Sequence, residues 1–269
     1  MIVMEEIQGV VREAAKFFAD RAAAGKIREK GAYDYVTAVD EAVQHFMQEK
    51  LSELYPRIQF MGEEKDNSAI DMKGSVWVLD PVDGTTNLVH DYRNSAISLA
   101  LMSNKEVILG IVYNPFSDEM YYAQKGKGSF LNGEEIHVSG AKTMKESLVS
   151  IGTSPYFKKE AEKNFRVFTQ IFKDCQDIRR CGSASLDLAH VACGRIDGYM
   201  ENHLKLWDYA AGALIVREAG GEVLNYVGEK LPMELDGNVV AGNPLISKIL
   251  LKEYLQKYLP VLKRCQEIK

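Results

Sequence analysis

The chain has 269 residues, of which 46% are hydrophobic and 26% are charged, a balance typical of a globular protein. Its net charge of -5 and its lack of a basic run argue against a nucleic-acid partner. No apolar run approaches the roughly 18 residues of a membrane span, and acidic Glu5 and Glu6 are unlike a signal peptide. We therefore expect a cytoplasmic protein of one large domain or two closely joined domains, with no membrane partner.

The cysteines and histidines do not form a familiar metal motif. Cys175, Cys181, Cys193 and Cys265 include no Cys-x-x-Cys pair, which argues against a zinc knuckle or a redox dithiol. The five histidines include no His-x-x-x-His pair, which argues against a zinc protease. We expect the cysteines to be free thiols in a reducing compartment.

The chain opens with two predicted helices. Apolar residues at helical spacing predict the first helix over residues 4–24. The polar residues 26–35 are expected to form a loop. A second helix is predicted over residues 37–55, with Thr37 as its N-terminal cap and Pro56 marking its end.

Short β-like runs follow and predict a mostly antiparallel sheet. Asn132 and Gly133 form a strong signal for a tight hairpin turn. The predicted strands are residues 58–61, 76–79, 95–102, 107–113 and 119–123, followed by a hairpin of residues 129–131 with 136–138.

The second half of the chain alternates strands with helices, which is an α/β pattern. The change of pattern near Gly140 predicts an N-terminal α+β subdomain, residues 1–140, and a C-terminal α/β subdomain, residues 141–269. Its predicted strands are residues 148–151, 198–201, 222–224 and 239–241, and its predicted helices are residues 157–172, 185–193, 207–219 and 245–258.

The strongest motif is Asp-Pro-Val-Asp-Gly-Thr-Thr-Asn at residues 80–87, directly after a buried strand. It places Asp80 and Asp83 beside a turn whose next residues can open a short helix, with free backbone N–H groups facing an anion. Two carboxylates would repel a phosphate unless divalent cations lay between them. Oxygen ligands of this kind favour magnesium, manganese or calcium over zinc. An ordinary strand-to-turn connection uses the same residue types, so the wider sequence decides.

Three further segments accompany this motif in a fixed order: Asp-Tyr-Val-Thr-Ala-Val-Asp at 34–40, Gly-Glu-Glu at 62–64, and Trp-Asp-Tyr-Ala-Ala-Gly at 207–212. With them the chain resembles the inositol monophosphatase family, within the lithium-sensitive, metal-dependent sugar phosphatases. The resemblance extends from Lys30 to the Glu-Ala-Gly-Gly segment at 218–221. It implies a mixed α+β and α/β, layered αβαβα fold, a phosphatase activity and a homodimer.

The resemblance also implies a set of metal ligands for two or three magnesium ions. Glu63, Asp80 and the backbone carbonyl of Val82 correspond to the ligands of the ion that activates the attacking water. Asp80 is shared with a second ion, whose other ligands correspond to Asp83 and Asp208. Glu63 is therefore counted among the catalytic residues as well.

Two further residues correspond to the family's catalytic groups. Thr85 resembles the threonine that orients the attacking water, and Asp40 resembles the aspartate that hydrogen-bonds to it. Lys30 lies where the family's mobile loop carries a lysine, although this loop is shorter than in the animal enzymes.

The implied substrate contacts come from both halves of the chain. Glu201 stands where the family has a glutamate that accepts hydrogen bonds from the substrate. Arg179 and Arg180 are either a solvated pair at a strand end or a contact to a second phosphate or a partner subunit. The full set of implied substrate contacts is Asp83, Gly84, Thr85, Thr86, Gly182, Ser183, Ala184, Glu201 and Asp208, with Arg180 as a further candidate.

Several substrates remain open. The expected reaction is the hydrolysis of inositol 1-phosphate, because Thr86, Asn87 and Leu88 replace the Lys-Glu-Phe that is typical of nucleotide 3′-phosphatases. The alternatives are fructose 1,6-bisphosphate, alone or with inositol phosphates, and, as less favoured choices, histidinol phosphate or a nucleotide 3′-phosphate. A different class of function is a non-catalytic sugar-phosphate binder or a regulatory partner protein.

Overall fold

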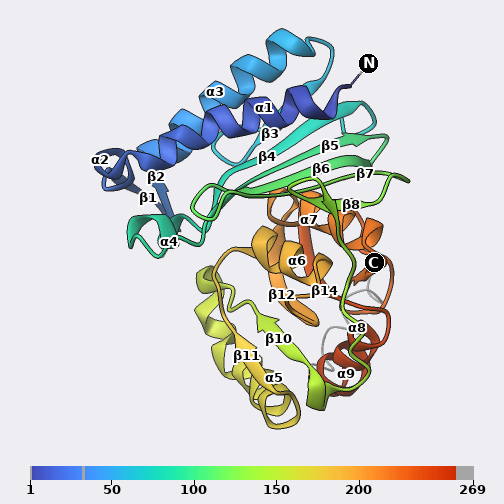
Figure 1. Cartoon of the computed structure of the whole chain (residues 1–269). Helices are drawn as coiled ribbons and strands as arrows, with labels where there is room; N and C mark the ends of the chain where they lie inside the picture. The colour runs from blue at the N-terminus through green and yellow to red at the C-terminus, as the bar shows by residue number, and fades with distance from the viewer. Residues whose placement is uncertain (1, 32–33, 259–269) are drawn as a thin grey trace.

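The computed structural model describes residues 2–31 and 34–258, so Cys265 lies outside the described residues. Its helices and sheets stack in five alternating layers, which confirms the expected αβαβα fold (Figure 1). Along this stack come an N-terminal helical layer, a seven-stranded sheet, a central pair of helices, a five-stranded sheet and a C-terminal helical layer.

The N-terminal helical layer covers one face of the larger sheet. The helix predicted over residues 4–24 is broken into α1 (Met4–Ala14), the 3-10 helix η1 (Ala15–Ala19) and α2 (Arg21–Ala24). The break occurs at Asp20, whose side chain accepts a hydrogen bond from the Ala23 N–H and so starts a new helix.

The second helix, α3 (Ala38–Leu54), begins as predicted at Thr37. Asp40 completes a capping box there by accepting a hydrogen bond from the backbone N–H of Thr37 at 2.8 Å. The buried side chains of Val43 and Met47 belong to the same hydrophobic cluster as Trp77 of the sheet. The cap therefore fixes the place of Asp40 on a helix that is itself anchored to the sheet.

The prediction of a loop over residues 26–35 is wrong. The chain forms an antiparallel hairpin of β1 (Ile27–Gly31) and β2 (Asp34–Thr37), in which Ile27 pairs with Thr37. All residues of β1 are exposed, so no apolar and polar alternation marks the strand in the sequence.

The seven-stranded sheet has the order β3-β4-β5-β6-β7-β8-β9, and only β3 and β4 pair in parallel. The mostly antiparallel prediction is therefore confirmed. The second strand of the last hairpin was predicted two residues too late, because the tight Asn132–Gly133 turn pairs Leu131 directly with Glu134. The strands are β3 (Gln59–Gly62), β4 (Ser75–Asp83), β5 (Ala96–Ser103), β6 (Glu106–Asn114), β7 (Glu119–Gln124), β8 (Ser129–Leu131) and β9 (Glu134–Glu135).

The five-stranded sheet is built entirely from the second half of the chain, in the order β11-β10-β12-β14-β13. Its parallel pairs are β10 with β11 and β10 with β12, and the others are antiparallel. The sequence did not predict β11. The strands are β10 (Leu148–Ile151), β11 (Asp177–Arg179), β12 (Gly198–Lys205), β13 (Glu222–Leu224) and β14 (Asp236–Gly242).

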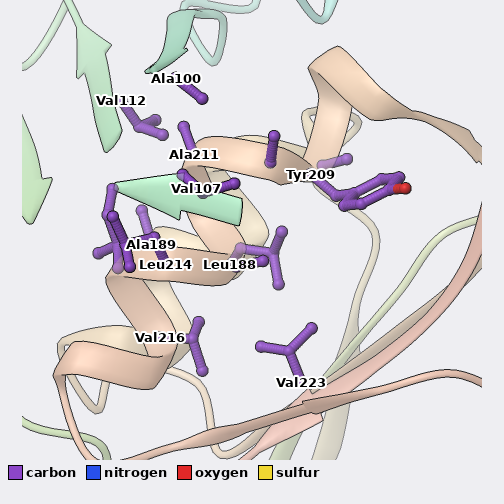
Figure 2. Packing of buried hydrophobic residues seen from close by; sticks show 14 of the residues in the cluster. Ala100, Val107, Val112, Leu188, Ala189, Tyr209, Ala211, Leu214, Val216 and Val223 are labelled. Atoms are coloured by element: carbon purple, nitrogen blue, oxygen red, sulfur yellow. The ribbon is translucent and has the colours of Figure 1, made fainter. Parts of the chain in front are cut away.

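The central layer joins the two sheets through α6 (Ala184–Ala192) and α7 (Leu206–Glu218). In Figure 2, Ala211 of α7 points toward Val112 of the larger sheet, and Val216 faces Val223 of the smaller one. A helix with both faces covered must be apolar all round, and α7 is buried almost throughout its length. Because α7 belongs to the second half but packs on the first sheet, the division into two subdomains stays a prediction.

The remaining helices lie at the edges of this stack. The helices predicted over residues 157–172 and 245–258 are each divided, the first at Glu160, whose φ of -94° and ψ of 2° lie outside the helical region. These helices are η3 (Pro155–Glu160) with α5 (Ala161–Asp174), and α8 (Ile246–Ile249) with the π-helix η4 (Leu250–Leu255) and α9 (Gln256–Tyr258), besides α4 (Thr85–Val89) and the 3-10 helix η2 (Met144–Glu146). Within the described residues, no helix is long and apolar enough to cross a membrane.

The close approach of α7 to the larger sheet makes Gly110 a test of the packing. A Cβ at this position would lie 2.8 Å from the carbonyl oxygen of Ala211, which is backbone and cannot move aside. We expect Gly110→Ala to lower the free energy of unfolding by about 1–3 kcal/mol in urea titrations. Gly9→Ala is the control, since nothing lies within 4 Å of its Cβ and alanine favours the helix. Equal stability of both variants would contradict this packing.

Candidate active site

A cavity of about 530 Å³ opens where the end of β4, the start of α4, the start of α7 and the strand β12 meet. Most of the residues that the sequence singled out line it. These are Lys30, Glu63, Asp80, Val82, Asp83, Gly84, Thr85, Thr86, Arg180, Gly182, Ala184, Glu201 and Asp208. Asp40 and Ser183 do not line the cavity, but they are hydrogen-bonded to Thr85 and Asp83, which do.

Asp80 and Asp83 occupy the end of β4, where the ladder to β5 becomes irregular. Asp80 is buried, and one of its oxygens accepts a hydrogen bond from the Val82 N–H at 3.0 Å. The irregular end lets both carboxylates reach the cavity, because a regular strand would send residues 80 and 83 to opposite faces.

Asp83 is tied to the beginning of α6. One of its oxygens accepts hydrogen bonds from the Ser183 hydroxyl at 2.6 Å, the Ser185 N–H at 2.7 Å and the Ser185 hydroxyl. The other oxygen accepts from the Ala184 N–H at 3.3 Å. The start of α6 thus holds the carboxylate from the opposite half of the chain. Sequence analysis assigned no role to Ser185, whose only signal was its place next to the Gly-Ser-Ala segment.

Asp208 lies in the first turn of α7, where it accepts a hydrogen bond from the Lys205 N–H at 2.7 Å. The preceding carbonyl, that of Trp207, accepts a hydrogen bond from the Ser98 hydroxyl of β5 at 3.0 Å. The start of α7 is therefore fixed to the larger sheet, next to the end of β4.

Glu63 follows β3 and faces a cation. The ammonium of Lys30 lies 2.9 Å from Glu63 Oε1 and 2.6 Å from Glu64 Oε1. Although burial alone lowers the pKa of Lys30, the two carboxylates raise it above its ordinary value. The hairpin that the sequence missed therefore brings Lys30 to the cavity.

Asp40, Thr37 and Thr85 form a buried hydrogen-bonded chain. Asp40 Oδ2 accepts from the Thr37 hydroxyl at 2.5 Å, and Oδ1 accepts from the Thr85 hydroxyl at 3.0 Å. Burial raises the pKa of Asp40 to about 6, against the opposing effect of the hydrogen bonds from Thr37 and Thr85. Thr85 Oγ1 also lies 3.0 Å from the Val82 carbonyl oxygen. These hydrogen bonds fix the direction of the Thr85 hydroxyl.

The carboxylates around the cavity repel one another. Burial raises the pKa of Asp80 well above its ordinary value, and the charges of Glu63, Asp83 and Asp208 raise it further. Burial and the charges of Glu63 and Asp83 also raise the pKa of Asp208. Burial raises the pKa of Glu63 to about 7, with Lys30 acting against it. Such a concentration of acids is stable in the ionised form only when cations neutralise it.

The ligand types fit magnesium, although the side chains do not enclose a common point. Among the described residues, no three carboxylate, imidazole or thiolate groups stand close enough to hold an ion as they are placed. The charges of Asp83 and Asp208 nevertheless both raise the pKa of Asp80, and all three residues line the same cavity. All the candidate donors are hard oxygens, which magnesium prefers.

Glu201 is held in place by residues that the sequence did not single out. Its oxygens accept hydrogen bonds from the Tyr199 hydroxyl at 2.8 Å and from the Ser154 N–H at 3.0 Å. A Cβ on Gly152 would lie 1.9 Å from the Glu201 carboxyl carbon, so this position has room only for glycine. Sequence separation hides the contact with Ser154, which is 47 residues from Glu201.

Asn87 connects the β4 motif to the Gly-Ser-Ala segment. Its side-chain amide donates to the carbonyl of Asn94 at 2.7 Å and to that of Cys181 at 2.8 Å. Gly84 and Gly182 both have positive φ, and a Cβ on Gly84 would lie 3.0 Å from the Gly182 carbonyl oxygen. Two glycines are therefore needed where the two halves of the chain approach at the cavity wall.

The two arginines point differently. Arg180 lines the cavity, and its Nε donates to the Thr153 hydroxyl at 3.1 Å. Arg179 turns toward Asp177, 2.6 Å away, and does not line the cavity. The outer wall also carries Phe157 stacked on His203, with ring centroids 4.0 Å apart. Sequence analysis assigned no role to this aromatic pair.

The layered fold and the acid-lined cavity agree with a phosphatase that acts on a phosphate monoester. It belongs to the inositol monophosphatase family, whose pattern matches residues 3–264. An inositol-1-monophosphatase of Rhizobium meliloti (strain 1021) is 38% identical over 231 residues, 86% of each chain. A protein of Escherichia coli (strain K12) named Nus factor SuhB is 37% identical over 236 residues, 88% of each chain.

The fold agrees with this family. The crystal structure of the extragenic suppressor protein suhB from Bartonella henselae has a TM-score of 0.88 to this chain at 32% identity, covering 94% of this chain and 98% of that one. Membership of the family supports metal-dependent phosphatase activity on a phosphate monoester. The relative named inositol-1-monophosphatase and the relative named Nus factor SuhB have nearly the same sequence identity to this chain. Membership of the family therefore does not decide the particular substrate.

Asp187 of α6 provides a test of the buried charges behind the cavity. It accepts a hydrogen bond from the Ser150 hydroxyl at 2.7 Å, and burial raises its pKa to about 8. Between about pH 4, its ordinary pKa, and pH 8, the folded state keeps a proton that the unfolded state releases. The free energy of unfolding therefore falls as pH rises through this window. We expect Asp187→Asn, which is neutral in both states, to reduce this fall in urea titrations at pH 5–8.

Asp66→Asn is the control for this titration. Asp66 is exposed, and hydrogen bonds from Ser68 lower its pKa, so its carboxyl is ionised across the whole range. It should leave the dependence on pH as in the wild type. If Asp187→Asn and Asp66→Asn gave the same pH profile, Asp187 would not be protonated in the fold.

Proposed function

We propose that the chain hydrolyses a small polyol phosphate, with inositol 1-phosphate as its first substrate and magnesium as its metal. The observation that carries the proposal is the meeting of Glu63, Asp80, Asp83 and Asp208, from distant parts of the chain, at one cavity. The name of the Rhizobium meliloti relative supports the choice of substrate. As in the sequence-based expectation, we also propose that the protein acts as a homodimer.

The metal ligands in this proposal are Glu63, Asp80, Val82, Asp83 and Asp208. Glu63, Asp80 and the Val82 carbonyl would hold one ion, and Asp80, Asp83 and Asp208 would hold a second. When bound, magnesium supplies Lewis acidity and neutralises negative charge on the phosphate. The Lys30 ammonium lies against Glu63 Oε1, so Lys30 would compete with a metal for this carboxylate.

The chain's own residues position the nucleophile. In-line attack on a phosphate monoester needs a water molecule held in one direction. The Thr85 hydroxyl lines the cavity, and Asp40 fixes its direction from behind. The hydroxyl can therefore orient a water molecule toward the phosphorus atom, and the buried Asp40 keeps that geometry.

Other residues of the cavity would bind the substrate. The first backbone N–H groups of α4, which begins at Thr85 after Gly84, have no partners within the helix and would bind phosphoryl oxygens. Glu201 retains lone pairs for the hydroxyl groups of a polyol, because each of its oxygens accepts only one of the hydrogen bonds described above. Thr86, Gly182 and Ala184 complete this wall, whereas Ser183 supports Asp83.

A second candidate function comes from the name of the Escherichia coli relative, Nus factor SuhB. A role as a Nus factor would make the chain a regulatory partner protein, in addition to or instead of an enzyme. The complete set of oxygen ligands supports catalysis. If the protein released no phosphate with magnesium from inositol 1-phosphate, fructose 1,6-bisphosphate or histidinol phosphate, the catalytic proposal would be abandoned in favour of this second role.

The metal proposal predicts a specific response to chelation. Removal of divalent ions with EDTA should abolish phosphate release from inositol 1-phosphate, and magnesium should restore it. Asp208→Asn keeps an oxygen that can accept from the Lys205 N–H but removes a charge. It should lower kcat about 10²-fold or more and raise the magnesium concentration needed for half-maximal rate. It should also weaken inhibition by lithium at the second site.

The control for this variant is Glu162→Gln. Glu162 is an exposed acid in the first turn of α5, so the same loss of charge should leave both quantities unchanged. Full activity after exhaustive chelation, or an unchanged magnesium response in Asp208→Asn, would refute the assignment of the second site.

Arg180 provides the test of substrate choice. If its guanidinium contacts a second phosphate, Arg180→Ala should reduce kcat/KM for fructose 1,6-bisphosphate about 10-fold more than for inositol 1-phosphate. Arg179→Ala is the matched control, since Arg179 is paired with Asp177 outside the cavity. Equal losses on both substrates would show that Arg180 has only a structural role.

A further inference from the structure

A second cavity of about 520 Å³ lies at the opposite end of α7 from Asp208. It is formed by the turn between β5 and β6, the turn after β7, the last turn of α7 and the segment after β13. It shares no lining residue with the candidate active site. Its charged lining residues are Lys105, Glu106, Lys125, Arg217, Glu218 and Lys230.

Cations predominate in this cavity, although the whole chain has a net charge of -5. Both carboxylates already have partners. Glu106 pairs with Lys125 at 2.6 Å, and Glu218 accepts the N–H groups of Gly126 and Gly128 at 3.0 and 3.1 Å. Within residues 2–31 and 34–258, the other three cations have no ion pair with a carboxylate. They are Lys105, Arg217 and Lys230.

Arg217 is the most confined of these cations. One terminal nitrogen of its guanidinium donates to the carbonyls of Val223 at 3.3 Å and Leu231 at 3.1 Å. Burial lowers its pKa, which means that its surroundings do not fully compensate the charge. An arginine has five N–H donors in a planar fork, so most of its donors remain for a ligand in the cavity. A half-buried cation of this kind is stabilised when an anion neutralises it.

The floor of the cavity is apolar. The side chains of Val107, Leu214 and Leu231 are buried beneath the charged rim. Val107 and Leu214 face each other across the junction of the larger sheet and α7 (Figure 2). The cavity thus offers an apolar surface for the carbon part of a ligand and a cationic rim for its charge.

We propose that this cavity binds a small phosphorylated metabolite, such as a nucleoside monophosphate, at a site separate from the active site. The guanidinium of Arg217 donates its remaining N–H groups, those on Nε and on the other terminal nitrogen, to the phosphate. Lys105 and Lys230 neutralise the remaining charge, and the apolar floor contacts the body of the ligand. The inference does not depend on the proposed function, because this cavity shares no lining residue with the candidate active site.

Calorimetric titration in EDTA at physiological salt separates the two sites, because the metal-free active site is acidic and repels an anion. Adenosine monophosphate is the probe, and adenosine is its uncharged control. We expect one binding site for the phosphorylated probe and none for adenosine. Binding should persist in Asp208→Asn, whose substitution lies at the other end of α7.

The variant Lys105→Ala/Lys230→Ala should weaken binding at least about 10-fold, as expected for loss of charged phosphate contacts. Both lysines are exposed, so the fold should tolerate the change. Arg217→Lys tests the guanidinium separately, because it keeps the positive charge but removes the guanidinium N–H donors. It should also weaken binding. Lys16→Ala/Lys50→Ala is the matched control, because these lysines belong to the helical layer on the opposite face of the larger sheet.

Three outcomes would overturn the proposal. The first is the absence of binding by adenosine monophosphate in EDTA. The second is equal weakening by the two double-lysine variants, which would indicate nonspecific attraction to positive charge. The third is loss of binding in Asp208→Asn with full binding in Lys105→Ala/Lys230→Ala, which would place the ligand in the active site.

Discussion

Mutual repulsion among carboxylates is the constraint on which this structure depends. Asp80, Asp83, Asp208 and Glu63 come from three separate parts of the sequence, yet the fold brings their charges to one cavity. Alone, these groups would favour separation or protonation. The surrounding elements hold them in place: the start of α6 donates hydrogen bonds to Asp83, and the start of α7 donates to Asp208. The fold thus holds four carboxylates close together at one cavity, where divalent cations can neutralise their charge.

The layered packing makes this concentration possible. α7 lies between the two sheets, and Gly110 brings the larger sheet within contact of the helix backbone. The same helix separates two cavities of opposite charge, with Asp208 in its first turn and Arg217 in its last. At the active-site wall, Gly152 leaves the space that Glu201 occupies. Small residues therefore decide how closely the charged side chains of the two halves approach.

The sequence predicted the elements that have strong periodicity and the acids that occur in motifs. The cap at Thr37 and the strands of the larger sheet follow from local pattern. The grouping of Glu63, Asp83 and Asp208 around Asp80 was implied by the family resemblance. The hairpin of β1 and β2 escaped prediction because its first strand is exposed and lacks alternation. The positioning contacts of Ser185 with Asp83 and of Ser154 with Glu201 join residues far apart in sequence, so no local signal marks them. The sequence analysis also missed the second cavity, because its cations lie on four separate segments of the chain.

The central claim is that divalent cations neutralise the carboxylates at the end of β4. Anomalous diffraction from crystals soaked in manganese, a hard cation with similar ligand preferences, tests it most directly. We predict anomalous peaks beside Asp80, one shared with Asp83 and Asp208 and one with Glu63, whose side chain would then leave Lys30. Manganese bound only elsewhere, or an unchanged Glu63–Lys30 contact with no peak at the cavity, would contradict the claim.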